Sequence, residues 1–214
     1  MKRSSLLACL LAAVCLFLAA PAAADSRTLD FDVRREGESI GTHRVSIRTD
    51  GPRTDVSIEI DLEVRFAFLT LYRYTHRARE TWEADRLVAL EASTDDNGTR
   101  TSVAARATAD GMAVEGSGGR YTAPADTYPT SYWRRDKVHR TQLLDTQSGK
   151  LVSVRNAGRG VFDMAVDGTA RPVEIFRIDG ELAAEVGYAD DGSWATLAFE
   201  ARGARIAYVR RASG

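Results

Sequence analysis

The chain has 214 residues, of which 44% are hydrophobic, and its 29 lysines and arginines stand against 30 aspartates and glutamates. The formal net charge of −1 excludes the strongly basic surface with which proteins bind nucleic acid or anionic membranes. This length suits a single domain with a core of its own.

The first 24 residues have the pattern of an export signal. Lys2 and Arg3 form a basic start, Leu6–Ala20 is an uncharged apolar run, and Ala22–Ala24 offers the small residues that signal peptidase requires. The apolar run is too short to span a bilayer as a helix. We therefore predict cleavage after Ala24 and a single periplasmic, β-rich domain over residues 25–214, not membrane-spanning.

Both cysteines fall inside this signal. Cys9 and Cys15 leave with it, so the mature chain has no disulfide, no thiolate nucleophile and no cysteine metal site. The segment that ends at Cys9 resembles a lipoprotein cleavage box, but almost no apolar run precedes it, which argues against lipidation. We predict no cofactor and no metal site, because the histidines are not at metal-ligand spacing.

Dipeptides that favour tight turns recur along the rest of the chain. They are Asp50-Gly51, Asn97-Gly98, Asp110-Gly111, Asp167-Gly168, Asp179-Gly180 and Asp191-Gly192. Aspartate or asparagine followed by glycine tolerates the positive φ of hairpin turns. The last three are 12 residues apart and have short apolar runs between them. This spacing predicts an antiparallel meander, and with it an all-β fold.

The clearest strand runs from Val56 to Phe68. Its even-numbered residues from Ile58 onward are all apolar and most of its odd-numbered residues are charged, which is the period of a half-buried strand. We expect all six even-numbered side chains, Ile58 to Phe68, to lie on the buried face. The sheet is expected to curl into an incomplete or flattened barrel.

The next run, Leu71–Trp82, alternates in the same way. One face carries Tyr72, Tyr74, His76, Glu80 and Trp82, and the other face carries Arg73, Arg77 and Arg79. A hairpin with the preceding strand would set these arginines beside its acidic residues and the aromatic residues beside its apolar ones. The inner face would then be apolar at one end and carry two polar groups further along.

Residues 116–149 break the strand pattern. Glycines and prolines interrupt this segment, and Thr130–Lys137 has the pattern of one or two helical turns capped by Thr130. We predict a crossover with one short helix, in which Tyr132 and Trp133 act as a lid over a cavity or simply seal the end of the barrel.

Of the three histidines, only His76 is expected inside. His43 and His139 are predicted at the surface or at an edge. His76 is interpreted as a hydrogen-bonded core histidine held by Glu80, or as a group that meets the polar end of a ligand.

Several segments carry a family resemblance. They are Ile40–Arg44, Leu71–Ala78, Ser93–Gly98, Ser131–Trp133 and the closing pattern from Gly180 to Tyr208. The chain resembles an exported proteobacterial family catalogued as a domain of unknown function, number sixty-one thirty-four. Many members have a cysteine where Thr130 stands, so any role of that cysteine does not carry over. The resemblance implies no known reaction. Its broader β-rich relatives are similar to open half-barrels that carry lipoproteins, which is an analogy of fold.

We expect a non-enzymatic binding module for an apolar or amphipathic ligand such as a lipid. The predicted ligand-binding residues are Tyr72, Tyr74, His76, Glu80, Trp82, Tyr132 and Trp133. Two alternatives stay open: an envelope structural or interaction protein with a packed core, and an envelope hydrolase that uses His76 and Glu80. No nucleophile elbow or phosphate loop is present, and no catalytic residue or protein partner is assigned.

Overall fold

The computed structural model describes residues 24–212, so the predicted export signal lies outside the described residues except for its last position. The first eight strands are β1 Asp25–Arg35, β2 Glu38–Asp50, β3 Arg53–Phe66, β4 Leu69–Glu83, β5 Arg86–Asp96, β6 Thr99–Thr108, β7 Gly111–Gly116 and β8 Gly119–Ala123. They are followed by the 3-10 helix η1 Arg135–His139, β9 Gln142–Leu144, β10 Leu151–Val166, β11 Thr169–Gly180, β12 Ala184–Ala189, β13 Trp194–Ala201 and β14 Ala204–Arg210.

The fourteen strands form one antiparallel sheet, in the order β8-β7-β6-β5-β4-β3-β2-β1-β14-β13-β12-β11-β10-β9. Chain neighbours pair as in a meander, and β1 also pairs with β14, which joins the first and last strands. The two edge strands, β8 and β9, do not pair with each other, so the barrel is not closed. The predicted all-β fold with an incomplete barrel is therefore confirmed.

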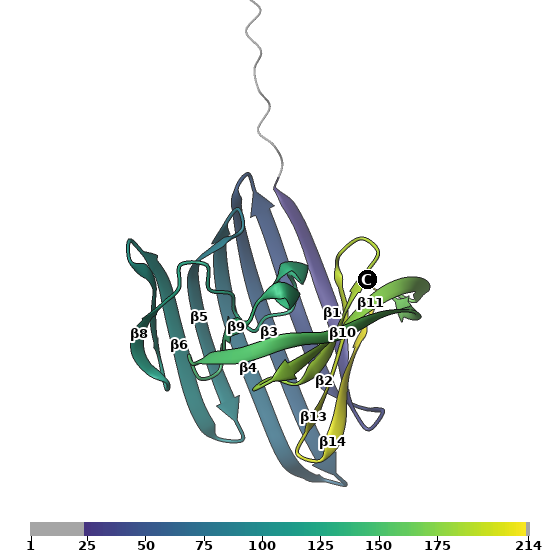
Figure 1. Ribbon diagram of the computed structural model, residues 1–214. Helices are drawn as coiled ribbons and strands as arrows, with labels where there is room; N and C mark the ends of the chain where they lie inside the picture. Colours follow the sequence, from purple (N-terminus) through teal and green to yellow (C-terminus); the bar gives the residue numbers. More distant parts are fainter. Residues whose placement is uncertain (1–23, 213–214) are drawn as a thin grey trace, which may run out of the picture.

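The sheet rolls so that its second half covers the first. In Figure 1, β1 to β6 form a curved wall, and β10 crosses in front of that wall at a steep angle with the short helix beside it. The rolled interior is filled by large side chains, of which Trp82, Trp194, Tyr188, Phe31 and Phe176 are the largest that are almost fully buried. Burial of such apolar area is the main term that stabilises the fold.

The gap between the two edge strands is bridged by hydrogen bonds to a turn, and not by strand pairing. The carbonyl oxygen of Ser148 accepts a hydrogen bond from the Gly118 amide at 2.8 Å, and the Tyr121 hydroxyl donates to the Gly149 carbonyl at 2.8 Å. At Gly116, a Cβ atom would lie only 2.8 Å from the Ser148 oxygen, which explains why this position is a glycine. The turn before β10 thus rests on the hairpin of β7 and β8.

Five of the six predicted turns form at or next to their dipeptides, but Asp179 and Gly180 both pair with β10 as the end of β11, so that turn follows them. Asn97 and Gly98 have φ of 52° and 93°, and Asp167 and Gly168 have φ of 52° and 78°. Two successive positive φ values are typical of the hairpin turn whose twist matches that of the strands. The turn chemistry thus predicted these hairpins correctly.

The register of β3 with β4 is the predicted one. Ile60 faces His76, Leu62 faces Tyr74, and Val64 faces Tyr72. On the opposite face, the Arg77 guanidinium bonds both carboxylate oxygens of Asp61, at 2.7 and 2.9 Å. The alternation of apolar and charged residues is therefore sufficient to set the pairing.

The burial of this hairpin fades toward its turn, which corrects one expectation. Ile58 and Ile60 are buried and Leu62 is half-buried, but Phe66 is 72% exposed and Phe68 is 90% exposed. Phe68 also lies in the turn, because β3 ends at Phe66. The hairpin extends past the core, so the last two apolar residues of the predicted face have nothing to pack against.

The crossover differs from the prediction in its ends and in its helix. Residues 119–123 form β8, so the irregular segment begins after Ala123. The helix starts at Arg135 and has no side-chain cap. Thr130 does not cap it: its hydroxyl lies 3.2 Å from the hydroxyl of Thr146 and accepts the Thr146 amide at 3.2 Å. A tertiary contact with the turn before β10 takes the place of the predicted cap.

Candidate functional site

Strand β4 places the predicted site residues in a line along the inner face. Their burial increases along the strand: Tyr72 and Tyr74 are half-buried, and His76, Glu80 and Trp82 are buried. Residues two apart on a strand are about 6.6 Å apart, so this line runs from the lower end of the barrel in Figure 1 deep into its interior.

Glu80 is the deepest charged group on this line, at 1% exposed. Its Oε2 atom accepts hydrogen bonds from the indole nitrogens of Trp82 and Trp133, both at 2.9 Å. Its Oε1 atom forms no hydrogen bond of ordinary geometry with the described residues. Burial raises the pKa of the carboxyl, against the opposing effect of the indole donors, the nearby Ser131 hydroxyl and the charge of Lys137.

Lys137 is a site residue that the sequence reasoning missed. It is 4% exposed, and its Nζ donates to the carbonyl oxygens of Thr130 and Ser131, at 3.0 and 2.8 Å. The ammonium lies 3.6 Å from the ring centre of Tyr132, a cation–π contact. Burial lowers the pKa of Lys137 to about 7, although the charge of Glu80 raises it. The sequence offered one signal for this residue: lysine is rare in the chain and is found only at positions 2, 137 and 150.

His76 is buried, as predicted, but Glu80 does not hold it. Its Nδ1 atom lies 2.8 Å from the hydroxyl of Thr94, the residue opposite it on β5. Burial lowers the pKa of His76 to about 4. Four residues along a strand separate two side chains by two full pleats, so the spacing of His76 and Glu80 is too long for a direct bond.

His43 was predicted at the surface, and this is wrong. It is 5% exposed and lies among Phe31, Trp194 and Tyr208, with ring centres 5.1 Å from Trp194 and 5.5 Å from Tyr208. Neither ring nitrogen has a hydrogen-bond partner among the described residues. Burial, and then the charge of His76, lowers the pKa of His43 to about 3.

The two histidines belong to one row across the sheet. Phe31, His43, Ile60, His76 and Thr94 face each other in succession on β1 to β5. The other histidine, His139, is exposed, as predicted. The apparent surface position of His43 came from the preceding Gly41-Thr42, which suggested a nearby hairpin, whereas β2 pairs with β1 and β3 in the middle of the sheet.

The predicted lid residues lie inside the barrel. Trp133 is 7% exposed and meets Trp82 edge to face at 5.7 Å, while half-buried Tyr132 lies 5.6 Å from Trp194. The guanidinium carbon of Arg134 lies over the Trp82 ring, 4.7 Å from the ring centre. The crossover thus brings Trp133 to Trp82 and Glu80 of β4 and Tyr132 to Trp194 of β13, in both cases as part of the packed interior.

At the lower end of the barrel, Tyr72 lies under a bridge between two distant turns. Arg202 follows β13 and forms an ion pair with Asp96, at the end of β5, at 3.2 Å. The guanidinium also lies 4.7 Å from the ring centre of Tyr72. Half-buried Leu62, Tyr74 and Phe199 pack against the core. We call this region the lower mouth: Leu62, Tyr72, Tyr74, Asp96, Phe199 and Arg202.

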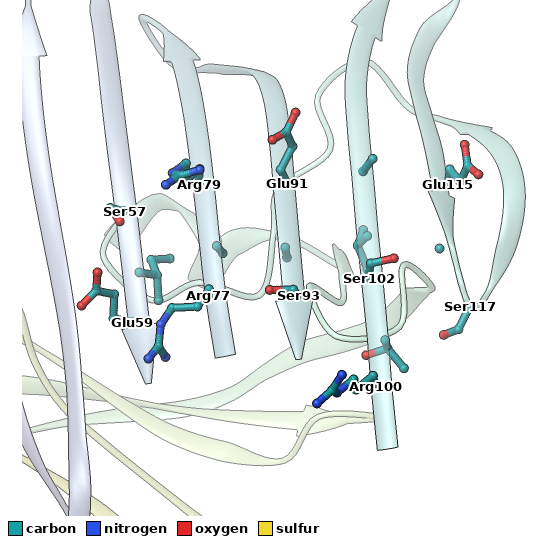
Figure 2. A pocket seen from close by; sticks show the side chains of 17 residues that line it. Ser57, Glu59, Arg77, Arg79, Glu91, Ser93, Arg100, Ser102, Glu115 and Ser117 are labelled. Atoms are coloured by element: carbon teal, nitrogen blue, oxygen red, sulfur yellow. The ribbon is translucent and has the colours of Figure 1, made fainter. Parts of the chain in front are cut away.

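Two of the hollows on the surface of residues 24–212 can be compared with the predicted site. One, of about 810 Å³, lies at the other end of the barrel and includes Trp133, Arg134 and Asp85. The other, of about 970 Å³, lies on the outer face of β3 to β7, where Figure 2 shows Glu59, Arg77, Ser93 and other polar side chains. The outer hollow contains none of the predicted site residues. It is open and charged, so it does not resemble a cavity for an apolar ligand.

The arrangement can bind more readily than it can catalyse. His76 is almost sealed from solvent and has no bond to Glu80, so the pair is not set up as a base and acid that meet a substrate. Among residues 24–212, no group of three or more histidine, cysteine, aspartate or glutamate side chains could hold a metal ion. The remaining chemistry is that of a polar cluster inside an aromatic interior.

Comparison with known proteins decides the family. The profile of the family described as "Domain of unknown function (DUF6134)" matches residues 31–211. The chain belongs to this family. No curated protein matches the chain.

A solved structure supports the fold. The chain is similar to a crystal structure of a "Beta-barrel-like Protein of Domain of Unknown Function DUF1849 from Brucella abortus", with a TM-score of 0.53 and 9% sequence identity. The similarity covers 86% of this DUF6134 chain and 94% of the other. In the part of the chain that is described, no helix has the length and apolar character needed to cross a bilayer.

Proposed function

We propose that this DUF6134 protein is a non-enzymatic binding module of the bacterial periplasm for an amphipathic ligand with a lipid-like body. The observation that carries the proposal is Glu80: a carboxyl group at 1% exposure with one oxygen bound by two indoles and the other without a hydrogen bond of ordinary geometry, although the Ser131 hydroxyl lies near the group. A buried polar atom without a partner costs about 1–3 kcal/mol, and such atoms are rare where only packing is required.

The surrounding groups fit the polar end of an amphiphile. His76, Lys137 and the Thr94 hydroxyl lie in the interior, and His43 contributes two unpartnered ring nitrogens. Aromatic side chains surround them and offer a large apolar surface with polar edges. A ligand that enters at the lower mouth would pass Tyr72 and Tyr74, keep its apolar body against Leu62 and Phe199, and bring its polar group to His76.

Binding to the deepest group requires the crossover to move. Trp133 holds the carboxylate of Glu80 from the crossover side, and Lys137 is held by its own segment through Thr130 and Ser131. A ligand that takes over the bond to Glu80 would release Trp133. The ligand and Trp133 would therefore compete for the hydrogen bond to Glu80.

A second candidate function, an envelope interaction protein with a packed core, is favoured by one observation. Trp82, Trp133 and Trp194 are each at most 7% exposed and contact other aromatic rings. Such contacts describe a filled interior, and a filled interior binds nothing unless it opens.

A fluorescence titration separates the two. Delipidated protein is titrated with palmitate and with lysophosphatidylethanolamine, and the emission of the three tryptophans is followed. The binding module predicts a saturable shift, which Tyr74→Asp weakens by roughly tenfold or more because it places a charge in the lower mouth. Trp133→Phe keeps the ring but loses the bond to Glu80, and it should bind more tightly because the lid is released.

The matched control is Phe162→Asp, which places the same charge at an exposed position on β10 and should bind as wild type does. No saturable response of the wild type, or equal responses from wild type, Tyr74→Asp and Trp133→Phe, would reject the binding module in favour of the packed interaction protein.

A further inference from the structure

The turn of the β3–β4 hairpin presents an apolar tip to solvent. We define the apolar tip as Phe66, Phe68, Leu69 and Leu71, which are 72%, 90%, 54% and 59% exposed. In Figure 1 this hairpin reaches furthest down at the lower end of the barrel. Four large apolar side chains within six residues are exposed at one turn, where Phe66 pairs with Leu69, and apolar side chains exposed together on a protein surface mark places of interaction.

The second position of this turn departs from that of the other two-residue hairpins, because Phe68 stands where Gly37, Asp85 or Gly203 stands in them. Asn97-Gly98 and Asp167-Gly168 place polar residues and glycine at their turns, where positive φ is required. Here Ala67 adopts a φ of +53°, and Phe68 follows it. Ala84 adopts the same conformation in the β4–β5 turn, with a φ of +52°, so the unusual residue is Phe68. A phenyl ring that is 90% exposed at a turn position serves neither solubility nor turn geometry.

Two arginines lie just behind the apolar tip. The side chains of Arg65 and Arg73 are 68% and 65% exposed, one on each strand of the hairpin. Both guanidinium groups approach the carboxylate of Glu63, Arg65 at 2.9 Å and Arg73 at 3.7 Å. Two positive charges thus stand against one negative charge, so these three side chains together keep a positive charge. An apolar point with arginines one or two residues behind it matches a bilayer, where acyl chains lie beneath a layer of phosphates.

The shape of the apolar tip also selects its partner. A protruding turn offers a convex surface, which a deformable lipid layer can surround and which a preformed protein groove would have to match in shape. The tip adjoins the lower mouth, because Tyr72 follows Leu71 directly and lies under Arg202.

We infer that the apolar tip inserts into the surface of a phospholipid bilayer and so places the lower mouth against the membrane. This inference deepens the proposed function, on which it rests for the identity of the cargo, because it names the bilayer as the place where an amphiphile is taken up or released. The net charge of −1 provides no long-range attraction. Membrane binding should therefore depend mainly on the tip, with a smaller, salt-sensitive contribution from Arg65 and Arg73 on anionic lipid.

Co-sedimentation with vesicles of phosphatidylethanolamine and phosphatidylglycerol tests the inference on the whole mature chain. The wild type should sediment with the vesicles, and the double variant Phe66→Ser/Phe68→Ser should bind roughly tenfold more weakly or worse. The double variant Val161→Ser/Phe162→Ser is the matched control, because it removes equally apolar residues that are 65% and 58% exposed on β10. It should sediment as the wild type does.

A second measurement reports insertion itself. The wild type measured in parallel gives the response of the three buried native tryptophans, so the additional response of a Phe68→Trp variant comes from the tip. Brominated acyl chains should quench it, and the quenching should be absent when the same vesicles lack bromine. Replacing both arginines, as Arg65→Gln/Arg73→Gln, should weaken binding on phosphatidylglycerol vesicles more than on phosphatidylcholine vesicles.

The outcomes separate this inference from the proposed function. If the tip double variant loses vesicle binding but still binds palmitate in solution, both stand. Vesicle binding by a wild type that shows no saturable ligand response leaves the tip as a membrane anchor and rejects the binding module. Wild-type protein that stays in the supernatant, a tip variant that sediments as well as the wild type, or a tip that pairs two chains instead of binding lipid overturns the inference.

Discussion

At the scale of single residues, the interior holds more polar groups than packing needs. Four side chains, those of His43, His76, Glu80 and Lys137, are each at most 5% exposed. Burial penalises their charged forms, so it lowers the pKa values of the two histidines and of Lys137 and raises the pKa of Glu80. The fold therefore carries a cost that depends on pH. This cost can be measured one residue at a time.

His43→Phe should stabilise the protein. Both ring nitrogens lack a partner, and a phenyl ring suits the neighbours Phe31, Trp194 and Tyr208, so we expect a gain of about 1 kcal/mol at pH 7.5. In the wild type the unfolded chain takes up a proton below pH 6.5, while folded His43 stays neutral down to about pH 3. Stability therefore falls as pH drops through this window, and the gain should grow by about 2 kcal/mol at pH 5.

Urea unfolding at the two pH values measures the His43→Phe effect. His139→Phe changes an exposed histidine in the same chain and should leave the free energy of unfolding nearly unchanged. A loss of stability in His43→Phe at both pH values would mean that the ring nitrogens make bonds that the structure does not contain.

Lys137 gives a pH dependence of the same sign as His43, but at higher pH. The unfolded chain keeps this proton up to about pH 10.5, and the folded chain releases it near pH 7, so the unfolded state binds more protons between these values. Stability should therefore rise with pH, by about 2 kcal/mol between pH 7 and pH 9. Lys137→Met should remove most of that slope, and Lys150→Met, at an exposed position, should keep it. The same slope in all three proteins would show that Lys137 is not buried.

Residue by residue, the alternation in the sequence placed Tyr72, Tyr74, His76, Glu80 and Trp82 on the inner face, because a strand has period two. It could not provide their partners. Thr94, which holds His76, is a cross-strand neighbour 18 residues away, and Trp133, which holds Glu80, is 53 residues away. Such contacts depend on how the sheet rolls and on where the crossover runs.

At the scale of elements, the β3–β4 hairpin shows what local pattern decides. Its register followed from charge and apolarity alone, since a slip of one residue would have buried arginines. Its burial did not follow, because the alternation continues past the point where the second half of the sheet covers it. The helix shows the converse: Thr130 has the chemistry of a cap, but a contact with Thr146 uses the hydroxyl.

The two faces of β3 should respond differently to substitution. Ile58 is 4% exposed, so Ile58→Asp would bury an unpaired carboxylate at a cost of several kcal/mol, which is most of the stability of a typical domain. Glu59 lies on the exposed face next to Ile58, and Glu59→Ile should change the free energy of unfolding by less than about 1 kcal/mol. Soluble yield and thermal unfolding of both variants check this, and similar loss in both would contradict a one-sided sheet.

At the scale of the whole molecule, short hairpins add up to a sheet that nearly encloses its own interior. The meander was predictable from the turn dipeptides. The pairing of β1 with β14 was not, because it joins residues about as far apart as the chain allows, such as Arg35 and Ile206. The crossover that fills the interior also had no local signal beyond its loss of strand pattern. The polar cluster therefore became visible only with the complete fold.

Native mass spectrometry of the protein purified from the cells that produce it tests the binding module most directly, because it asks what the interior holds without choosing a ligand in advance. We expect a population of chains that each carry the additional mass of one amphiphile. Denaturation should release the amphiphile, and this population should be much smaller in the Tyr74→Asp variant. A chain that shows only its own mass, in the wild type as in the variant, would contradict a binding module and leave an interaction protein with a filled core.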